Sequence, residues 1–292
     1  DNSLIFSFLC KEFNKKIRKI NPDTLILFGD RYEMLSAAIA SMFLNIPIIH
    51  LHGGESTEGS IDDNIRHAIT KMSHFHFVAS NKYKKNVIQL GENPKNIFNT
   101  GSLSAERIKV MKKMSNKEIA ELIGFDLTNN YFLVCVHPVT IYHKETRILI
   151  DALIKSLNSF KEYKIIFTYP SFDQEHRYII KKINNYQKNN NNRICIKKNL
   201  GNDLYLNILK NSKAIIGNSS SGILDAPYLK VPTINLGNRQ NGRLMANSIV
   251  NCCLKERDIL KSIKFILSNK FQKKLKQNKT YYGTGNTSNK II

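Results

Sequence analysis

The chain reads F-G-D-R-Y-E at residues 28–33 and I-I-H-L-H-G-G-E-S-T-E-G-S-I-D-D-N-I-R-H at residues 48–67. Each segment begins at the end of a short apolar run, the first at 24–28 and the second at 46–49. Apolar runs of this length that alternate with helical patterns predict buried strands of a parallel sheet. Ionisable side chains just past the carboxyl ends of such strands lie where open α/β sheets place their ligands. The two segments therefore predict an α/β fold with a catalytic site.

The alternation of strand and helix continues in two series. The first has predicted strands at 24–28, 46–52, 74–79 and 97–100, with helices before residue 22, at 32–44, at 62–71 and up to residue 90. The second has predicted strands at 131–136, 164–168, 193–196, 214–216 and 233–236, with helices at 145–160, 203–209 and 256–267. Two such series predict two Rossmann-like domains that face each other across a cleft. The expected domains are 1–115 and 116–270, with a tail, 271–292, that packs back on the first.

The composition limits the partners of the protein. The 292 residues carry a net charge of +21, but the lysines are scattered and do not interleave with aromatic residues as in RNA-binding surfaces. The sequence has no run of about 18 apolar residues, so it predicts no membrane-spanning helix. Five cysteines without metal-ligand spacing fit a reducing compartment better than a disulfide framework. We therefore expect a cytoplasmic protein with no nucleic-acid partner and no membrane partner.

An anion-binding turn is predicted where I-G-N-S-S-S-G, residues 216–222, leads from a strand into a helix that continues toward residue 228. Free backbone N–H groups and serine hydroxyls at such a turn bind phosphate oxygens. The alternative is an ordinary serine N-cap, but a cap needs one serine and this turn has three. The next loop carries Arg239 and Arg243, whose guanidinium groups suit phosphate contacts. Since no Walker lysine follows, the pattern favours a diphosphate site that is not a P-loop.

Carboxylates gather in the opening stretch, at Asp30, Glu55, Asp62 and Asp63. Removing a proton from carbon and later returning one requires at least two proton-transfer groups. Asp30 is alternatively a turn residue, and Asp62 a charge at a helix N-terminus. His137 ends another predicted strand at the level of the serine turn, which favours a position facing the ligand.

Histidines near the same stretch raise the question of a zinc site. No cysteine lies near them and no HExxH motif occurs, so we expect no metal. The histidines concerned are His50, His52, His67, His74 and His76.

Taken together, these motifs closely resemble those of the hydrolysing UDP-N-acetylglucosamine 2-epimerases, bacterial enzymes of sialic- and legionaminic-acid biosynthesis. The resemblance covers the chain from near residue 4 to its end. The motifs are G-D-R-Y-E (29–33), H-L-H-G-G-E with its continuation (50–77), H-P-V-T (137–140), F-T-Y-P (167–170), G-N-S-S-S-G-I (217–223) and N-L-G-N-R-Q-N-G-R (235–243).

The resemblance implies a glycosyltransferase-B-like fold with a nucleotide sugar in the cleft and no cofactor. The implied reaction eliminates UDP from UDP-N-acetylglucosamine to give a 2-acetamidoglucal intermediate. Water then adds with inversion at C2, which yields N-acetylmannosamine and UDP. The same chemistry on the 2,4-diacetamido-2,4,6-trideoxy analogue of the legionaminic-acid pathway is a close alternative. A homo-oligomer, either a dimer or a tetramer, is also expected.

Roles for individual residues follow from the resemblance alone. Asp30 and Asp62 are the implied acid–base groups, Glu55 is their neighbour, and His50 and His137 polarise or orient substrate atoms. Substrate contacts are implied for Arg31, Arg66, Thr140, Asp173, Asn218, Ser219, Ser220, Arg239 and Arg243, with Arg31, Ser219, Ser220 and Arg239 holding UDP.

Two positions depart from the commonest family pattern. His52 stands where some relatives have a catalytic glutamate and others share the histidine, which marks a subgroup with a modified substrate. Asp225 stands where the family usually has a glutamate that accepts a ribose hydroxyl, and the shorter side chain must reach farther.

Three other functions share parts of this pattern. Non-hydrolysing epimerases typically have G-D-T and V-E-A-G in place of G-D-R and L-H-G-G. A glycosyltransferase would need an acceptor to release UDP, and the carboxylate-rich first half argues against it. A non-catalytic nucleotide-sugar-binding module would tolerate the loss of the carboxylates.

The family normally has a further stretch upstream that includes the first β-strand. We therefore expect that the first domain is truncated at its N-terminus. A sheet without its first βαβ units exposes apolar surface, so the chain is expected to be inactive or poorly folded by itself.

Overall fold

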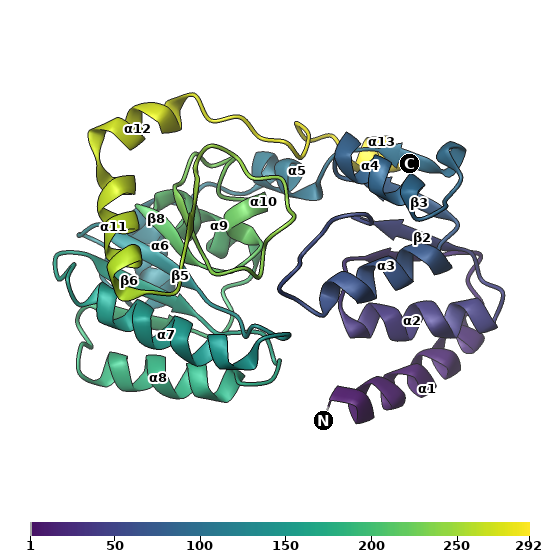
Figure 1. Ribbon diagram of the computed structural model, residues 1–292, viewed down its shortest axis with the longest axis horizontal. Helices are drawn as coiled ribbons and strands as arrows, with labels where there is room; N and C mark the ends of the chain where they lie inside the picture. Colours follow the sequence, from purple (N-terminus) through teal and green to yellow (C-terminus); the bar gives the residue numbers. More distant parts are fainter. Residues whose placement is uncertain (1) are drawn as a thin grey trace. The chain divides into compact units, whose positions relative to one another are not determined.

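The computed structural model describes residues 2–292, which form two compact α/β units (Figure 1). The first unit comprises the residues up to Glu106 together with Tyr282–Ile292, and the second comprises Arg107–Tyr281. Both sheets are parallel throughout, which confirms the predicted fold class. The domain boundaries expected at residues 115 and 270 stay predictions. The expected truncation of the first domain at its N-terminus also stays a prediction.

The first unit is built on a four-stranded sheet whose strands neighbour one another in chain order. The strands are β1 (Leu25–Phe28), β2 (Ile48–Leu51), β3 (Phe75–Val78) and β4 (Ile97–Asn99). The helices are α1 (Asn2–Ile20), α2 (Tyr32–Phe43), α3 (Asp62–Met72), α4 (Asn81–Gln89) and α5 (Leu103–Val110), with a 3₁₀ turn at Pro94–Asn96 and α13 (Ser288–Ile291) near the C-terminus. Among residues 2–292, no helix combines the length and the apolar character that crossing a bilayer requires.

The two faces of this sheet differ in burial. One face carries Leu27, His50, His76 and Ile97 in register across the four strands, and all four are buried. The opposite face has four apolar side chains that are 42–56% exposed, namely Ile26, Phe28, Phe75 and Phe98. Parallel sheets usually have both faces covered, so this face is unlike an ordinary protein surface.

The C-terminal segment closes the first unit. Tyr282 accepts a hydrogen bond at its carbonyl from the N–H of Ser102 at 2.7 Å, and its hydroxyl lies 3.0 Å from that of Tyr83. The Thr287 hydroxyl donates to the carbonyls of Thr100 and Ser102. These contacts hold the last residues of the chain against the loop that follows β4.

The second unit has a six-stranded sheet with the order β10-β9-β8-β5-β6-β7. Its strands are β5 (Tyr131–Cys135), β6 (Lys164–Thr168), β7 (Ile194–Lys197), β8 (Ala214–Gly217), β9 (Thr233–Leu236) and β10 (Ile249–Cys252). Its helices are α6 (Asn116–Ile123), α7 (His143–Leu157), α8 (His176–Lys188), α9 (Asn202–Asn211), α10 (Ser221–Leu224), α11 (Glu256–Leu267) and α12 (Asn269–Lys276).

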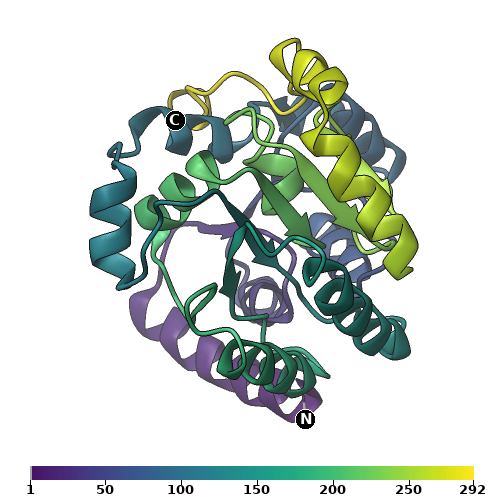
Figure 2. The ribbon, with the colours of Figure 1, turned by 90° about the vertical axis from the view of Figure 1, so that its left-hand side faces the viewer.

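Helices cover both faces of this second sheet (Figure 2). Phe132 and Val134 of β5 pack into a core with residues of α7, α8 and α11. Leu133 and Cys135, which point the opposite way because side chains alternate along a strand, pack with α6 and α9. The continuous apolar run of β5 therefore reflects burial on both sides.

The sequence-based prediction missed several elements, among them α6, β10 and the short helices α12 and α13 in the expected C-terminal tail. Helix α6 begins after a capping box in which the Ser115 side chain accepts from the N–H of Glu118, while the Glu118 carboxylate accepts from the N–H of Ser115. This S-x-x-E pattern was available in the sequence. Strand β10 is half-exposed and carries Asn251, so its sequence has no apolar run to reveal it. Conversely, the helix expected as far as residue 228 ends at Leu224, ahead of Pro227.

Gly217, the last residue of β8, lies where the backbone of β8 closely approaches that of β5, and a substitution can test whether this approach requires glycine. Its φ is +148°, and a Cβ there would lie 1.9 Å from the carbonyl oxygen of Cys135. We expect Gly217→Ala to lower the free energy of unfolding by about 3 kcal/mol or more, since backbone has to move. Urea denaturation followed by circular dichroism measures this.

The matched control for this substitution is Gly124→Ala. Gly124 has a φ of +59° but nothing within 4 Å of an added Cβ, so only the left-handed backbone cost of about 1 kcal/mol is expected. Equal losses in the two variants would show that the approach to Cys135 is not what requires glycine.

Candidate active site

The buried guanidinium of Arg66 organises the first unit. Arg66 lies on α3 and is 1% exposed. Its Nε donates to Oδ2 of Asp30 at 3.1 Å, and its Nη2 binds the same oxygen. Nη1 donates to the carbonyl of Glu55 at 2.7 Å and to Oδ1 of Asp63 at 3.1 Å, and Nη2 donates to the Thr57 hydroxyl at 3.0 Å. One side chain therefore joins the loop after β1, the loop after β2 and the start of α3.

Asp63 completes this network at the first turn of α3. Its Oδ1 accepts from the N–H of Thr57 at 2.5 Å, and its Oδ2 lies 3.6 Å from Nε2 of His67. Partial burial raises the pKa of Asp63, but the hydrogen bonds from His67 and Thr57 and the charge of Arg66 outweigh it and lower the pKa to about 2. Asp63 therefore stays ionised and fixes the loop at 55–61.

Asp30 and Arg31 follow the end of β1. Gly29 has a φ of +98°, which turns the chain sharply out of the strand. The Asp30 side chain is 24% exposed, so Arg66 holds it while part of it stays accessible. Arg31 occupies the N-cap position of α2, and its Nε donates to the Glu33 carboxylate at 3.2 Å.

His50 is fully buried within the layer between the sheet and α3. Its Nε2 lies 3.0 Å from the carbonyl of Gly29, and its Nδ1 lies 3.1 Å from the Thr70 hydroxyl. Burial lowers the pKa of His50 to about 4, although the hydrogen bond to the Gly29 carbonyl opposes this. Because both ring nitrogens bind protein atoms, a neutral His50 positions the loop of Asp30 and does not face a ligand directly.

His52 and Glu55 form a pair at the end of β2. Nδ1 of His52 lies 2.9 Å from Oε1 of Glu55, whose side chain is 2% exposed. The φ of His52 is +66°, which ends the strand at Leu51, short of the predicted 52. The His52 ring packs edge-on against the Phe28 ring, with centroids 5.0 Å apart.

Asp62 begins α3 and is also buried. Its Oδ2 accepts a hydrogen bond of 2.6 Å from the Ser60 hydroxyl.

The two glycines of the H-L-H-G-G-E motif are required because a side chain would clash at either position. A Cβ on Gly53 would lie 2.9 Å from Oγ1 of Thr70, and one on Gly54 would lie 2.5 Å from the Tyr83 carbonyl oxygen. The loop can therefore lie flat against α3 and α4.

In the second unit, the candidate site lies where the strand order reverses. Strand β5 has β6 on one side and β8 on the other, and ligands bind at such switch points in open α/β sheets. Asn218, fully buried just after β8, accepts from the N–H of His137 at 2.7 Å and donates to its carbonyl at 2.8 Å. Nδ1 of His137 in turn accepts from the N–H of Ser171 at 3.1 Å. This leaves Nε2 of a neutral His137 as the protonated ring nitrogen.

The serine turn and the arginine loop meet at Asn218. Its carbonyl accepts from Nε2 of Gln240 at 2.9 Å and from Nη1 of Arg239 at 3.4 Å. Ser219 accepts from the N–H of Ser221 at 3.3 Å, as an N-terminal cap does. Ser219 and Ser220 are half-buried, and so is Arg243. The structure thus brings the predicted serine turn and Arg239 together at one strand end.

The remaining residues of the predicted set lie around the same strand ends. Asp225 is buried, and its Oδ1 accepts from Nη2 of Arg107 at 2.9 Å. Asp173, also buried, accepts from the Ser171 hydroxyl at 2.6 Å. Thr140 is half-buried in the loop after β5. Sequence reasoning missed Arg107, which belongs to none of the motifs, and Gln240, which lies inside the 235–243 motif but was passed over in favour of its charged neighbours.

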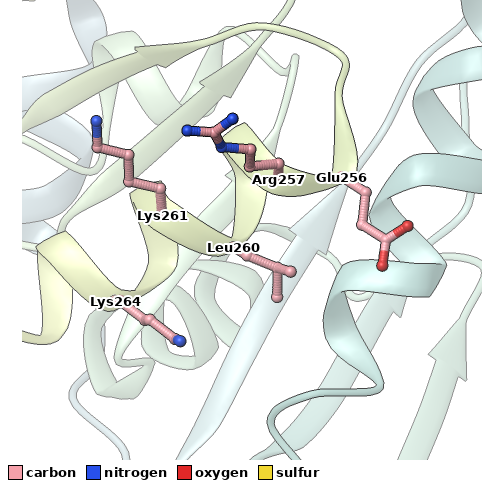
Figure 3. Close-up of a pocket in the computed structure, with 5 residues that line it drawn as sticks. All are labelled: Glu256, Arg257, Leu260, Lys261 and Lys264. Atoms are coloured by element: carbon pink, nitrogen blue, oxygen red, sulfur yellow. The ribbon is translucent and has the colours of Figure 1, made fainter.

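Neither a metal cluster nor a surface hollow on α11 competes with these sites. Within the described part of the chain, no group of three or more His, Cys, Asp or Glu side chains could hold a metal ion. A shallow hollow of about 690 Å³ lies on the outer surface of α11 and is shown in Figure 3. Its lining comes from α11 alone: Glu256, Arg257, Leu260, Lys261 and Lys264. It contains no residue of the motifs and lies at no strand end, so we assign it no catalytic role.

Comparison with known proteins identifies one family. The sequence model of the family described as UDP-N-acetylglucosamine 2-epimerase matches residues 3–292. The "GDP/UDP-N,N'-diacetylbacillosamine 2-epimerase (hydrolyzing)" of Campylobacter jejuni is 41% identical over 256 residues, 88% of this chain and 66% of the relative. The "Polysialic acid biosynthesis protein P7" of Escherichia coli is 40% identical over 250 residues, 85% of this chain and 63% of the relative. The chain thus spans a little less than two thirds of the length of these curated relatives.

Solved structures share the fold. The UDP-GlcNAc 2-epimerase of Neisseria meningitidis, bound to UDP-GlcNAc, superposes with a TM-score of 0.83 at 16% identity, covering 100% of this chain and 81% of that one. The Methanocaldococcus jannaschii UDP-GlcNAc 2-epimerase, in complex with UDP-GlcNAc and UDP, gives a TM-score of 0.81 at 20% identity over 98% of this chain and 79% of that one. These matches confirm the glycosyltransferase-B-like class of the two α/β units.

The buried neutral His50 generates a prediction about acid stability. In the unfolded chain its pKa is near 6.5, whereas the folded value is about 4, so protons bind to the unfolded state first as the pH falls. The stability that depends on neutral His50 is complete above pH 6.5 and is lost progressively down to about pH 4, amounting to about 3 kcal/mol. Urea denaturation at several pH values measures this slope.

His50→Gln provides the comparison for this titration. Glutamine has an amide N–H to offer the Gly29 carbonyl but does not titrate. We expect the variant to be less stable at pH 7 and to have a shallower loss of stability between pH 6.5 and 4. An unchanged slope in the variant would mean that other groups carry the acid sensitivity.

Proposed function

Because the chain belongs to the UDP-N-acetylglucosamine 2-epimerase family, we propose that it carries the reaction centre of a hydrolysing 2-epimerase of UDP-2-acetamido sugars. The reaction would eliminate UDP by removal of the proton at sugar C2, and water would then add to the 2-acetamidoglucal intermediate. The products would be UDP and the free sugar with inverted configuration at C2. The relative from Campylobacter jejuni, named as a hydrolysing 2-epimerase, supports the hydrolytic outcome.

The observation that carries this proposal is that the buried cation of Arg66 binds Asp30 to α3, the helix that begins with Asp62. Inversion at a carbon requires a proton to leave one side and a proton to arrive on the other, so two groups are needed. Asp30 is held by Arg66, and Asp62 is held by the Ser60 hydroxyl. Their loops are joined through Arg66 to the backbone of Glu55, so the groups keep fixed positions relative to one another.

We assign the UDP portion of the substrate to the second unit. The serine turn at Ser219 and Ser220 offers hydroxyl and backbone donors, and Arg239 offers a guanidinium beside it. His137 lies at the neighbouring strand end, where Asn218 binds its backbone and the N–H of Ser171 binds its Nδ1, and its ring is the proposed contact to a phosphate or sugar oxygen. Asp225 is paired with Arg107, and its second oxygen is the proposed acceptor for a ribose hydroxyl.

Other assigned residues have supporting roles in the proposal. Arg31, Thr140, Asp173, Asn218 and Arg243 contact the substrate or orient the groups that do. His50 acts by positioning the loop of Asp30, since its ring nitrogens bind Gly29 and Thr70. No cofactor and no metal enter the reaction.

The substrate is one of two nucleotide sugars. UDP-N-acetylglucosamine is the leading choice. UDP-2,4-diacetamido-2,4,6-trideoxyglucose is the second candidate, favoured by the relatives from Campylobacter jejuni and Legionella pneumophila, which are named as N,N'-diacetylbacillosamine 2-epimerases. Incubating the full-length protein with each UDP-sugar and identifying the released monosaccharide by NMR decides between them.

The cellular setting is proposed from simpler observations. All five cysteines are free thiols in the structure, which suits a reducing cytoplasm. We propose a cytoplasmic homo-oligomer, a dimer or a tetramer, that has a UDP-sugar as its partner and binds neither nucleic acid nor a membrane.

Asparagine substitutions separate an epimerase from a binding module. We expect Asp30→Asn and Asp62→Asn in the full-length protein to lower the rate of UDP release by about 100-fold or more, since each removes a proton-transfer group. Their affinity for UDP, measured by calorimetry, should stay within a few-fold of the unchanged protein, because the UDP residues lie on other strands.

Ser219→Ala and Arg239→Ala are the matched variants in the proposed UDP site of the second unit. We expect these two substitutions to weaken UDP binding. If the asparagine variants kept full turnover, or if UDP release required an added sugar acceptor, the proposed reaction would be wrong.

A further inference from the structure

Helices α11 and α12 of the second unit carry a dense positive charge. Residues 255–279, which include both helices, contain nine basic and two acidic residues. Their net charge of +7 is one third of the +21 of the whole chain. The two helices follow each other directly along the chain (Figure 1). All nine basic residues are exposed, and we call them the basic surface: Lys255, Arg257, Lys261, Lys264, Lys270, Lys273, Lys274, Lys276 and Lys279.

The charges of the basic surface are not balanced within residues 2–292, where none of its nine side chains forms an ion pair. Other exposed cations of the second unit do have carboxylate partners: Arg147 binds Glu175, and Lys182 binds Asp151. Basic residues three and four positions apart on one helix, as in both α11 and α12, lie on the same face and repel each other. An anionic partner would relieve this repulsion.

Insertion into a membrane does not suit these helices. A helix that lies in a bilayer surface buries its own apolar face among the lipids. The apolar faces of α11 and α12 are already part of the core of the second unit, through Ile259, Ile263, Ile266, Phe271 and Leu275. Within residues 255–279, therefore, no continuous apolar face is left to enter a bilayer.

The basic surface also lacks the pattern of a nucleic-acid site. Proteins that bind single strands stack bases on aromatic side chains, and those that read base edges mainly use arginine. Residues 255–279 contain two aromatic residues, and one of them, Phe271, is 1% exposed. The other, Phe265, packs edge-on against Phe271 with ring centroids 5.2 Å apart. Eight of the nine basic residues are lysine.

The hollow on α11 gives the basic surface a shape that fits a protein segment. Arg257, Lys261 and Lys264 line this hollow of about 690 Å³, and Figure 3 shows the Leu260 side chain among them. Leu260 is half-buried and packs against the core of the unit, so it is a fixed apolar contact point. An apolar centre with a charged rim is the usual anatomy of a protein–protein interface.

We propose that this hollow binds an acidic segment of a partner protein. An apolar side chain of the segment would contact Leu260, and its carboxylates would pair with Arg257, Lys261 and Lys264. The rest of the basic surface would attract the segment at longer range and raise the rate of association. This inference goes beyond the proposed function and does not depend on it, since the lining of the hollow includes no residue assigned to the substrate.

The test uses the full-length protein and two fluorescein-labelled peptides, one of glutamate alone and one with a leucine at its centre. We expect fluorescence anisotropy to show binding of both peptides at low salt, with the leucine peptide bound several-fold more tightly. The Kd of both should rise as sodium chloride is added, because exposed charges are screened.

Charge reversal locates the binding. We expect Lys261→Glu combined with Lys264→Glu to weaken the binding of both peptides by about 10-fold or more. The matched control is Lys210→Glu combined with Lys213→Glu, two exposed lysines of the second unit outside the basic surface, and it should stay within about two-fold. Leu260→Ala should remove the advantage of the leucine peptide and leave the glutamate peptide unchanged. Circular dichroism checks the fold, and the charge reversals still decide the test if Leu260→Ala unfolds.

Two kinds of result overturn the proposal. If the unchanged protein bound both peptides equally, or if the control variant lost as much affinity as the variant in the hollow, the attraction would be diffuse and the hollow would not be a docking site. If duplex DNA or vesicles containing phosphatidylserine bound more tightly than the leucine peptide and were lost in the same variant, the partner would be a different anionic macromolecule.

Discussion

The first unit depends on the burial of one positive charge. The guanidinium of Arg66 is almost completely removed from water, and such a charge is tolerated only when ionised partners and hydrogen-bond acceptors surround it. Asp30, Asp63, Thr57 and the carbonyl of Glu55 supply these acceptors, and they come from three separate segments. The need to satisfy the guanidinium therefore fixes the relative positions of the groups that we assign to proton transfer.

The second unit uses a neutral group for the same purpose. The amide of Asn218 binds the backbone of His137 in both directions, and its carbonyl gathers Gln240 and Arg239. A neutral amide suits a phosphate-binding role, since a carboxylate there would repel the anion. Gly217 makes this possible, because the backbone of β8 approaches Cys135 too closely for any side chain. In both units a buried polar side chain behind the strand ends holds the loops that carry the residues we assign to the substrate site.

The sequence could predict the strands other than β10, and most of the longer helices, because these have an apolar period and end at a glycine or a polar turn. It could also place the site residues at strand ends, since parallel strands all present their carboxyl ends at one edge. It could not show that Arg66 binds Asp30, because that contact joins residues 36 positions apart and no local pattern encodes it. His50 illustrates the same limit: a histidine at a strand end suggests a ligand contact, and only the tertiary packing against Thr70 and Gly29 reveals its positioning role.

The central claim, that one planar cation fixes the proton-transfer groups, is tested most directly by Arg66→Lys in the full-length protein. Lysine keeps the charge but lacks the rigid fork that binds several acceptors at once. The account predicts that UDP release falls by about 100-fold, as expected when reacting groups shift by about 1 Å, while UDP affinity stays within a few-fold. A lysine variant that releases UDP at the original rate would contradict it.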